Sequence, residues 1–291
     1  MVGFVVWENI ATYPMLPARL FTNKVSSRCP IFLMFQRVSI LLLLMSLVFG
    51  ANFWSVAAFW PLQAEQLYGP GGVKISYDLL PYGYGLIAGI ALFNIAVSIF
   101  PTAIREILTL GAAMSTAGIA GMAALNPTNA ALGRGLSFLA AFGSGGIIYP
   151  PTTVLTCVCP DDLIGTVSAI MVSIRYIGAS VGFAVYFNVL NRKLTADLQS
   201  NVANAAIQAG LSLDQLPGFL GALFGSNSTA LAGYPLSVLE AGEVAVKSTY
   251  QDSFKLVYLI SIAFGGTAVL CCVLLGNVRK YIVDRVAVDI H

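Results

Sequence analysis

Long apolar stretches constrain this chain more than any other feature of its sequence. A helix needs about 20 apolar residues to cross the hydrocarbon of a bilayer, and six stretches reach that length. Because lipid offers no partner to a free backbone amide or carbonyl, each stretch must be helical. We therefore expect an all-α membrane protein that forms a six-helix bundle. The predicted spans are 38–60, 79–101, 104–125, 131–158, 163–190 and 253–276.

Composition excludes several other classes of protein. Hydrophobic residues make up 57% of the 291 positions and charged residues only 10%, which is far from the balance of a water-soluble enzyme. The formal net charge of +2 is too small and too sparse to coat a nucleic-acid groove. Cys157 and Cys159 are closely spaced, but neither a second pair nor a histidine accompanies them. We predict no enzymatic activity, no cofactor, no metal and no nucleic-acid partner.

The segments outside the spans predict how the chain is organised around the bundle of residues 38–276. Residues 1–7 resemble the remnant of a preceding transmembrane helix, and 8–37 have the prolines and basic residues of a cytoplasmic connector. Residues 277–291 are predicted to be a cytoplasmic tail. Residues 191–252 are predicted to be a long outer loop that lies on the membrane surface or caps the bundle; a substrate-selecting lid is the alternative.

Basic residues predict the orientation, because Lys and Arg near span ends concentrate on the cytoplasmic side. Placing both termini inside puts eight basic residues there, namely Arg19, Lys24, Arg28, Arg37, Arg105, Arg279, Lys280 and Arg285. The outer loop contains a glycosylation sequon that begins at Asn227. We expect an integral protein of the plasma membrane with a cytoplasmic C-terminus.

The fourth span carries the most unusual local sequence. Proline removes a helical hydrogen bond and its ring presses on the preceding turn, so Pro150 and Pro151 predict a kink. A kinked helix can act as a gate and expose carbonyls to a polar cavity; a static kink in a closely packed helix is the alternative. The other residues of this candidate site are the glycines Gly143, Gly145 and Gly146 and the polar lining residues Tyr149, Thr152 and Thr153.

Arg175 is a charge close to the middle of the fifth span. Counting roughly 12 residues at about 1.5 Å each places it near 18 Å into the membrane, where a cation needs a partner. One interpretation is a cavity-facing cation that contacts an anionic or polar substrate group, or a carboxylate of another bundle. The other is a guanidinium that satisfies carbonyls of a neighbouring broken helix. Arg134 lies near an outer span end, where it is expected to reach the headgroups.

Two further groups of residues are candidates for roles inside the bundle. Asn52 and Asn94 lie at mid-span depth, where an amide needs hydrogen-bonding partners; they contact substrate or form interhelical hydrogen bonds. The glycines of two G-x-x-x-G patterns are predicted to let helices pack closely, with a dimer face as the alternative. These glycines are Gly85, Gly89, Gly178 and Gly182.

Four segments carry a family resemblance. They resemble the C-terminal half of fungal major facilitator transporters of the trichothecene-efflux-pump branch. The segments are residues 143–153, 160–169, 173–182 and 13–21. The resemblance implies a fold of fourteen helices in which the six spans correspond to helices nine to fourteen. It also implies that an N-terminal bundle, which commonly carries the acidic residues for proton coupling, is missing here and acts as a partner.

These features predict a transporter. The resemblance implies proton-driven efflux of small apolar toxins or drugs, and a small-molecule substrate as the second partner after the lipid bilayer. Siderophore-iron transport within the same superfamily is an alternative. A non-transporting, truncated product is another, because no Asp or Glu falls in the middle of a predicted span.

Overall fold

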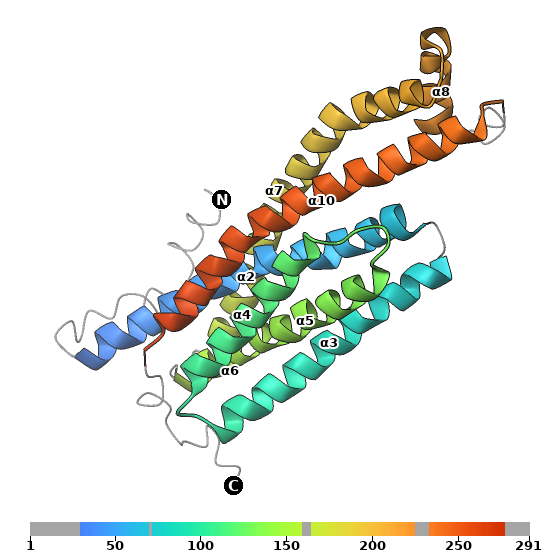
Figure 1. Cartoon of the computed structure of the whole chain (residues 1–291). Coiled ribbons are helices and arrows are strands. Elements are labelled where there is room, and N and C mark those ends of the chain that lie inside the picture. Colours follow the sequence, from blue (N-terminus) through green and yellow to red (C-terminus); the bar gives the residue numbers. More distant parts are fainter. Residues whose placement is uncertain (1–29, 70–71, 159–163, 225–232, 277–291) are drawn as a thin grey trace.

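The apolar stretches fold into long helices that lie side by side in the computed structural model (Figure 1). The structure describes residues 30–69, 72–158, 164–224 and 233–276, and these contain no strand. The elements are α2 (Pro30–Tyr68), α3 (Gly72–Ile99), α4 (Ile104–Met122), α5 (Ala130–Ile148), α6 (Pro150–Val158), α7 (Ile164–Gln208), the 3-10 turn η3 (Leu213–Gln215), α8 (Leu216–Phe224) and α10 (Leu236–Val273). The predicted all-α fold is confirmed.

Among the residues that the structure describes, five helical segments are long and apolar enough to cross a membrane: α2, α3, α5 continued by α6, α7 and α10. The remaining predicted span, 104–125, coincides with α4, which has 19 residues and carries the charged pair Arg105 and Glu106 in its first turn. That pair makes α4 less apolar than the sequence count implied. Residues 1–7, most of the predicted connector and residues 277–291 lie outside the described residues, whereas α2 already begins at Pro30.

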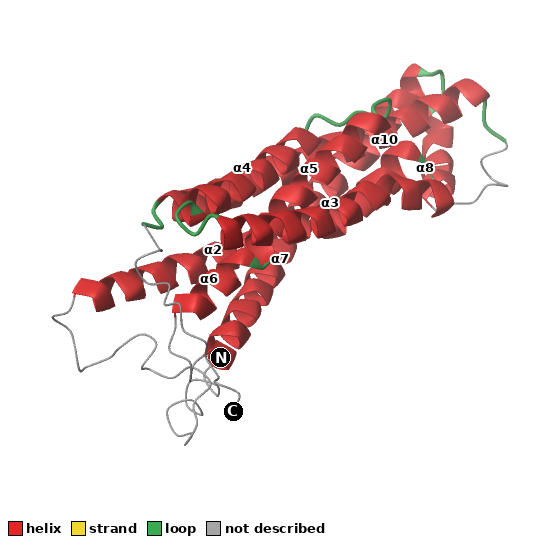
Figure 2. Ribbon diagram, turned by 90° about the horizontal axis from the view of Figure 1, so that it is seen from below, coloured by secondary structure: helices red, strands yellow, loops and turns green. Residues whose placement is uncertain are grey.

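The helices pack in two groups that meet at α10. In one group α5 lies between α3 and α4; in the other α2 packs on α7. The last helix, α10, contacts α2, α7 and α4 and so joins the groups, as the ribbon views show (Figures 1 and 2). Side chains on the outer face of α3 are apolar and open, and Ile87 is 68% exposed. A row of this kind fits a helix that faces lipid.

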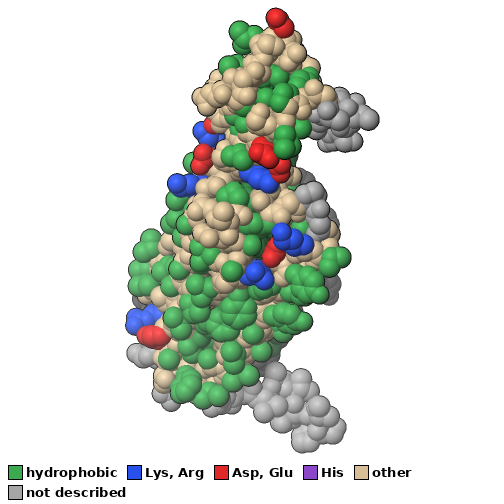
Figure 3. Space-filling model, turned by 45° about the vertical axis from the view of Figure 1, so that its right-hand side comes forward, with side chains coloured by type: hydrophobic (Ala, Val, Ile, Leu, Met, Phe, Trp, Pro, Cys, Tyr) green, Lys and Arg blue, Asp and Glu red, His purple; other side chains and the backbone are tan. Residues whose placement is uncertain are grey.

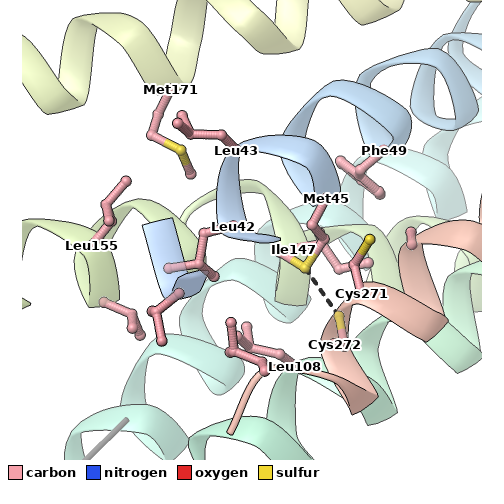
Figure 4. Packing of buried hydrophobic residues seen from close by; sticks show 14 of the residues in the cluster. Leu42, Leu43, Met45, Phe49, Leu108, Ile147, Leu155, Met171, Cys271 and Cys272 are labelled. Atoms are coloured by element: carbon pink, nitrogen blue, oxygen red, sulfur yellow. Dashed lines mark hydrogen bonds between the residues drawn. The ribbon is translucent and has the colours of Figure 1, made fainter. Parts of the chain in front are cut away.

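Two apolar cores fill the bundle. The first lies near the α5–α6 junction and brings together Leu42, Met45, Leu108 and Leu155 (Figure 4). There the thiol of Cys272 contacts the sulfur of Met45 at 2.9 Å. The second core is aromatic and consists of Val56, Phe59, Trp60, Ile119, Met122, Leu125, Ala140, Tyr186, Leu190, Phe254, Val257 and Tyr258.

The segment predicted as an outer loop is largely helical. The helix α7 continues past residue 190 to Gln208, and α10 begins at Leu236, so both extend well beyond their predicted spans. With α8 they form a projecting hairpin, at the upper right of Figure 1. The hairpin has an apolar core of its own, made by Val202, Ala206, Leu211, Phe219, Leu220, Val238 and Ala245.

Polar contacts mark the base of this hairpin. The amide of Asn201 donates to the hydroxyl of Thr249 at 3.0 Å, which ties α7 to α10. Lys193 pairs with Asp197, and Lys247 pairs with Glu243, each within one helix. On the face in Figure 3, charged side chains gather along the middle of the molecule, with an apolar surface below them. The sequon at Asn227 lies outside the described residues.

Candidate functional site

The fourth span is broken where the two prolines enter it. Helix α5 ends at Ile148, Tyr149 forms the junction, and α6 begins at Pro150. The amides of Thr152 and Thr153 both donate to the carbonyl of Tyr149, at 2.9 and 3.1 Å. Because prolines have no N–H and the Thr152 amide is used in this way, the carbonyl of Ile148 lacks its usual helical donor.

Arg175 on α7 supplies a hydrogen-bond donor to the carbonyl that the break leaves without one. Its Nη2 donates to the carbonyl oxygen of Ile148, and the same nitrogen lies 3.4 Å from the hydroxyl of Thr152. The guanidinium therefore joins α7 to both sides of the α5–α6 junction. This is the contact expected of an arginine that satisfies a broken helix, one of the two interpretations drawn from the sequence.

The guanidinium of Arg175 also has hydrogen-bond donors that the described residues do not use. It has five N–H donors, and its Nε is buried and makes no hydrogen bond to the described part of the chain. Beside it the site is open, because Tyr149 is 53% exposed and Thr153 is exposed as well. A polar or anionic group that approaches the junction from this side meets an arginine with free donors and a phenol.

Close packing of α7 on α2 fixes the position of Arg175. Gly50 on α2 lies directly against the backbone carbonyl of Arg175, so a methyl group at residue 50 would overlap with it. The hydroxyl of Ser46, also on α2, donates a hydrogen bond to the carbonyl of Met171 at 3.4 Å. Met171 lies one turn before Arg175 in α7. The arginine is thus held by its backbone while its side chain reaches the break.

The glycines of α5 let this helix lie against two neighbours at once. Gly143 faces the backbone of α4 at Ser115, Gly145 faces the backbone of α3 at Ile90, and Gly146 faces the ring of Phe93. A side chain at any of the three would overlap with these atoms. The described segment of α5 ahead of the break is therefore tightly packed.

The G-x-x-x-G glycines lie at helix contacts inside the bundle. Gly85 and Gly89 on α3 face the α5 backbone at Phe138 and Phe142. On α7, Gly178 and Gly182 face α2 at Leu47 and Ala51. These surfaces are occupied by neighbouring helices of the same chain.

The two predicted asparagines belong to α2 and α3. Asn94 is half-buried and donates to the carbonyl of Ile90 in its own helix at 2.8 Å, whereas Asn52 is buried on α2. Pro150 and Pro151 are buried at the junction. In the described ranges, no three His, Cys, Asp or Glu side chains come together in a group that could hold a metal ion.

Sequence reasoning missed a charge pair near the other end of the bundle. Asp78 precedes the predicted second span, but α3 begins at Gly72 and includes it. Its carboxylate lies 3.6 Å from Nε of Arg134, the residue expected to reach the headgroups. The spacing of the two residues gives no signal, because they belong to different helices.

Together these features define a class of protein. Long apolar helices, a broken span and an arginine inside the apolar body belong to polytopic α-helical membrane proteins, in which broken helices and intramembrane charges line transport paths. The family model described as the fungal trichothecene efflux pump matches residues 13–291. The chain belongs to this family of major facilitator transporters, and the resemblance drawn from the sequence is confirmed.

Curated relatives agree with this family. The chain is 24% identical to an MFS-type transporter of Penicillium rubens, over 94% of this chain and 49% of the relative. It is 24% identical to the MFS-type transporter of the acurin A biosynthesis cluster of Aspergillus aculeatus, over 96% of this chain and 47% of the relative. It is 20% identical to the trichothecene efflux pump of Fusarium sporotrichioides, over 94% of this chain and 44% of the relative. The chain spans about half the length of these relatives.

Proposed function

We propose that this chain is one helical bundle of an efflux transporter of the major facilitator superfamily. Membership of the family over residues 13–291 supports this activity. Because the chain spans about half the length of its relatives, a second helical bundle completes the transport path. Transport then proceeds by rocking of the two bundles around a site between them.

The proposed cargo is a small, largely apolar organic molecule, and the proposed coupling ion is the proton. The printed names of two relatives support the cargo, since one is a trichothecene efflux pump and another belongs to the acurin A biosynthesis cluster. The proposed location is the plasma membrane. The basic residues after α10 support a cytoplasmic C-terminus.

One observation carries the proposal for this bundle: Arg175 donates to the carbonyl that the α5–α6 break leaves open. The contact bridges α7 and the junction, so a change in the bend alters the partner of the guanidinium. A polar group of the cargo that reaches the free donors competes for the same cation. Arg175 thereby links the bend of the fourth span to occupancy of the site.

Transport by arginine variants tests this function. The chain is expressed in a yeast strain that lacks its own drug pumps, alone and together with the N-terminal half of the Penicillium rubens relative. Retention of an apolar fluorescent dye and of a trichothecene is measured. We expect efflux with the second bundle present, and loss of efflux in Arg175→Ala and in Arg175→Lys, because an ammonium cannot replace the planar set of donors.

Arg192→Ala is the matched control, because Arg192 is an exposed arginine on the same helix. It is expected to transport as the unchanged chain does, at equal amounts of protein in the membrane fraction. Full efflux by Arg175→Ala would reduce this arginine to a structural contact. Absence of efflux under every condition would contradict the proposed function and favour a chain without transport activity.

A further inference from the structure

A groove opens between the first turns of α4 and the last turn of α10, and the proposed function does not use it. The start of α4 and the end of α10 lie at the same end of the molecule, and the two helices contact each other (Figure 1). The groove has a volume of about 480 Å³. Its walls are formed by Arg105, Glu106, Thr109, Leu110, Ala113 and Val273.

The groove changes from polar to apolar along α4. At one end lie the charged side chains of Arg105 and Glu106, which are 50% and 56% exposed. The other end is apolar and open, because Leu110 is 57% exposed and Val273 is 50% exposed. Seven residues separate Glu106 from Ala113, which is about 10 Å along the helix axis. A molecule that matches this surface has a charged group at one end and an apolar chain behind it, as a membrane lipid does.

Close packing of α4 on α10 limits the groove at its apolar end. Gly265 on α10 lies against Thr116 on α4, and a Cβ atom at residue 265 would be 2.5 Å from the hydroxyl oxygen of Thr116. Three residues earlier in α4, at Ala113, the two helices have diverged enough to leave the groove between them. On its other face α4 is anchored by Ile104 and Leu108, which are buried in the first apolar core. The groove is therefore bounded by packed helices.

The charges at the groove form a pair of opposite sign. Nε and Nη2 of Arg105 both donate to Oε1 of Glu106, at 3.1 and 2.8 Å. Nη1 of Arg105 makes no hydrogen bond to the described residues, and the last turn of α10 carries no charge. An exposed ion pair of this kind is weak, so a ligand can compete for both partners. The guanidinium then donates to a phosphate, and the carboxylate accepts from an ammonium group.

We propose that this groove binds a phospholipid whose headgroup carries a primary ammonium group. The phosphate accepts hydrogen bonds from Arg105, the ammonium donates to Glu106, and an acyl chain lies against the apolar end of the groove. One positive and one negative side chain match a zwitterionic headgroup better than an anionic one. A choline headgroup has the same phosphate, but its quaternary nitrogen has no N–H to donate. The bound lipid joins α4 to α10 where these helices diverge.

Photolabelling of the purified chain in phosphatidylcholine nanodiscs tests this site. Two probes are compared, a phosphatidylethanolamine and a phosphatidylcholine with the same diazirine-bearing acyl chains, and labelled residues are mapped by mass spectrometry. The exposed face of α3, which includes Ile87 and Ile95, is the internal reference for ordinary contact with lipid. In the groove we expect labelling by the ethanolamine probe to exceed that by the choline probe about two- to fivefold, the scale of one exposed ion pair. On α3 the two probes are expected to label equally.

Two substitutions with matched controls decide the assignment. Glu106→Gln removes the partner of the ammonium group and abolishes the preference for ethanolamine. Glu243→Gln makes the same change in the exposed pair with Lys247 and retains the preference. Ala113→Trp fills the groove and abolishes labelling there, whereas Ala117→Trp, one turn further along the exposed side of α4, leaves it unchanged.

Equal labelling of the groove by the two probes overturns the proposal, and so does a preference that survives Glu106→Gln. Labelling of α3 without labelling of the groove also overturns it, because residues 277–291 or a second copy of the chain would then fill the space. If Ala113→Trp does not fold, as judged by its circular dichroism, the smaller Ala113→Leu takes its place. The measurement requires no transport, so its failure and a failure of the efflux assay are separate results.

Discussion

The close contact between α2 and α7 makes a quantitative prediction about Gly182. A Cβ atom at this position would lie 2.5 Å from Cα of Ala51 and 2.6 Å from its Cβ, whereas ordinary contact begins at 3.4 Å. The neighbour is partly backbone, so it cannot move aside by rotation of a side chain. In Gly182→Ala the two helices must separate by roughly 0.9 Å, the difference between the first and last of these distances.

Gly266→Ala is the matched control, because a Cβ at residue 266 meets no atom within 4 Å. Both substitutions gain the same helix propensity, about 1 kcal/mol, so this term cancels between them. The difference in free energy of unfolding then isolates the steric cost. Overpacking of this kind costs about 1–3 kcal/mol, and we expect Gly182→Ala to be less stable than Gly266→Ala by that amount.

The assay is a titration of both purified variants in mixed micelles with a denaturing detergent, followed by far-ultraviolet circular dichroism. The midpoint and slope give the two free energies of unfolding. Equal stability of the variants would refute the reasoning, because it would mean that the α2 and α7 backbones are not in van der Waals contact at Ala51.

Three further outcomes follow from the structure. Replacement of Pro150 and Pro151 by Ala restores the missing amides, so α5 and α6 fuse into one helix and hydrogen exchange around Tyr149 slows. Phe219→Ala empties the hairpin core at a cost of about 3–5 kcal/mol, and limited proteolysis then cuts the hairpin while the bundle persists. A maleimide, read by mass spectrometry, labels the exposed Cys157 long before the buried Cys272; equal rates would contradict the packing in Figure 4.

The fold was predictable where length and hydropathy decide it. Spans of about 20 apolar residues have one solution in lipid, so helices over 38–60 or 79–101 follow from the sequence. The extension of α7 to Gln208 was not predicted, since residues 191–208 are polar enough to resemble a loop. Their helix is stabilised by packing of Val202 and Ala206 against α8 and α10, contacts that hydropathy does not reveal.

Part of the candidate site could also be predicted from the sequence, and part could not. Proline chemistry indicates a break near residue 150, and a cation at mid-span needs a partner, so both could be inferred. That Arg175 and Ile148 meet could not be inferred, because they are 27 residues apart and on different helices. Asp78 was overlooked because α3 begins at Gly72, seven residues before the predicted span, so Asp78 was placed in the loop ahead of it.

The continuity of α7 has a mechanical consequence. One unbroken helix carries Arg175 and, 27 residues further along, Val202 in the core of the hairpin. At about 1.5 Å per residue the two positions are roughly 40 Å apart. A tilt of about 5° at the arginine swings the far end by roughly 3.5 Å on this lever arm. A small tilt near the arginine therefore becomes a larger displacement at the projecting end of the molecule. A pair of spin labels placed at that end reports movements that are too small to detect at the arginine itself.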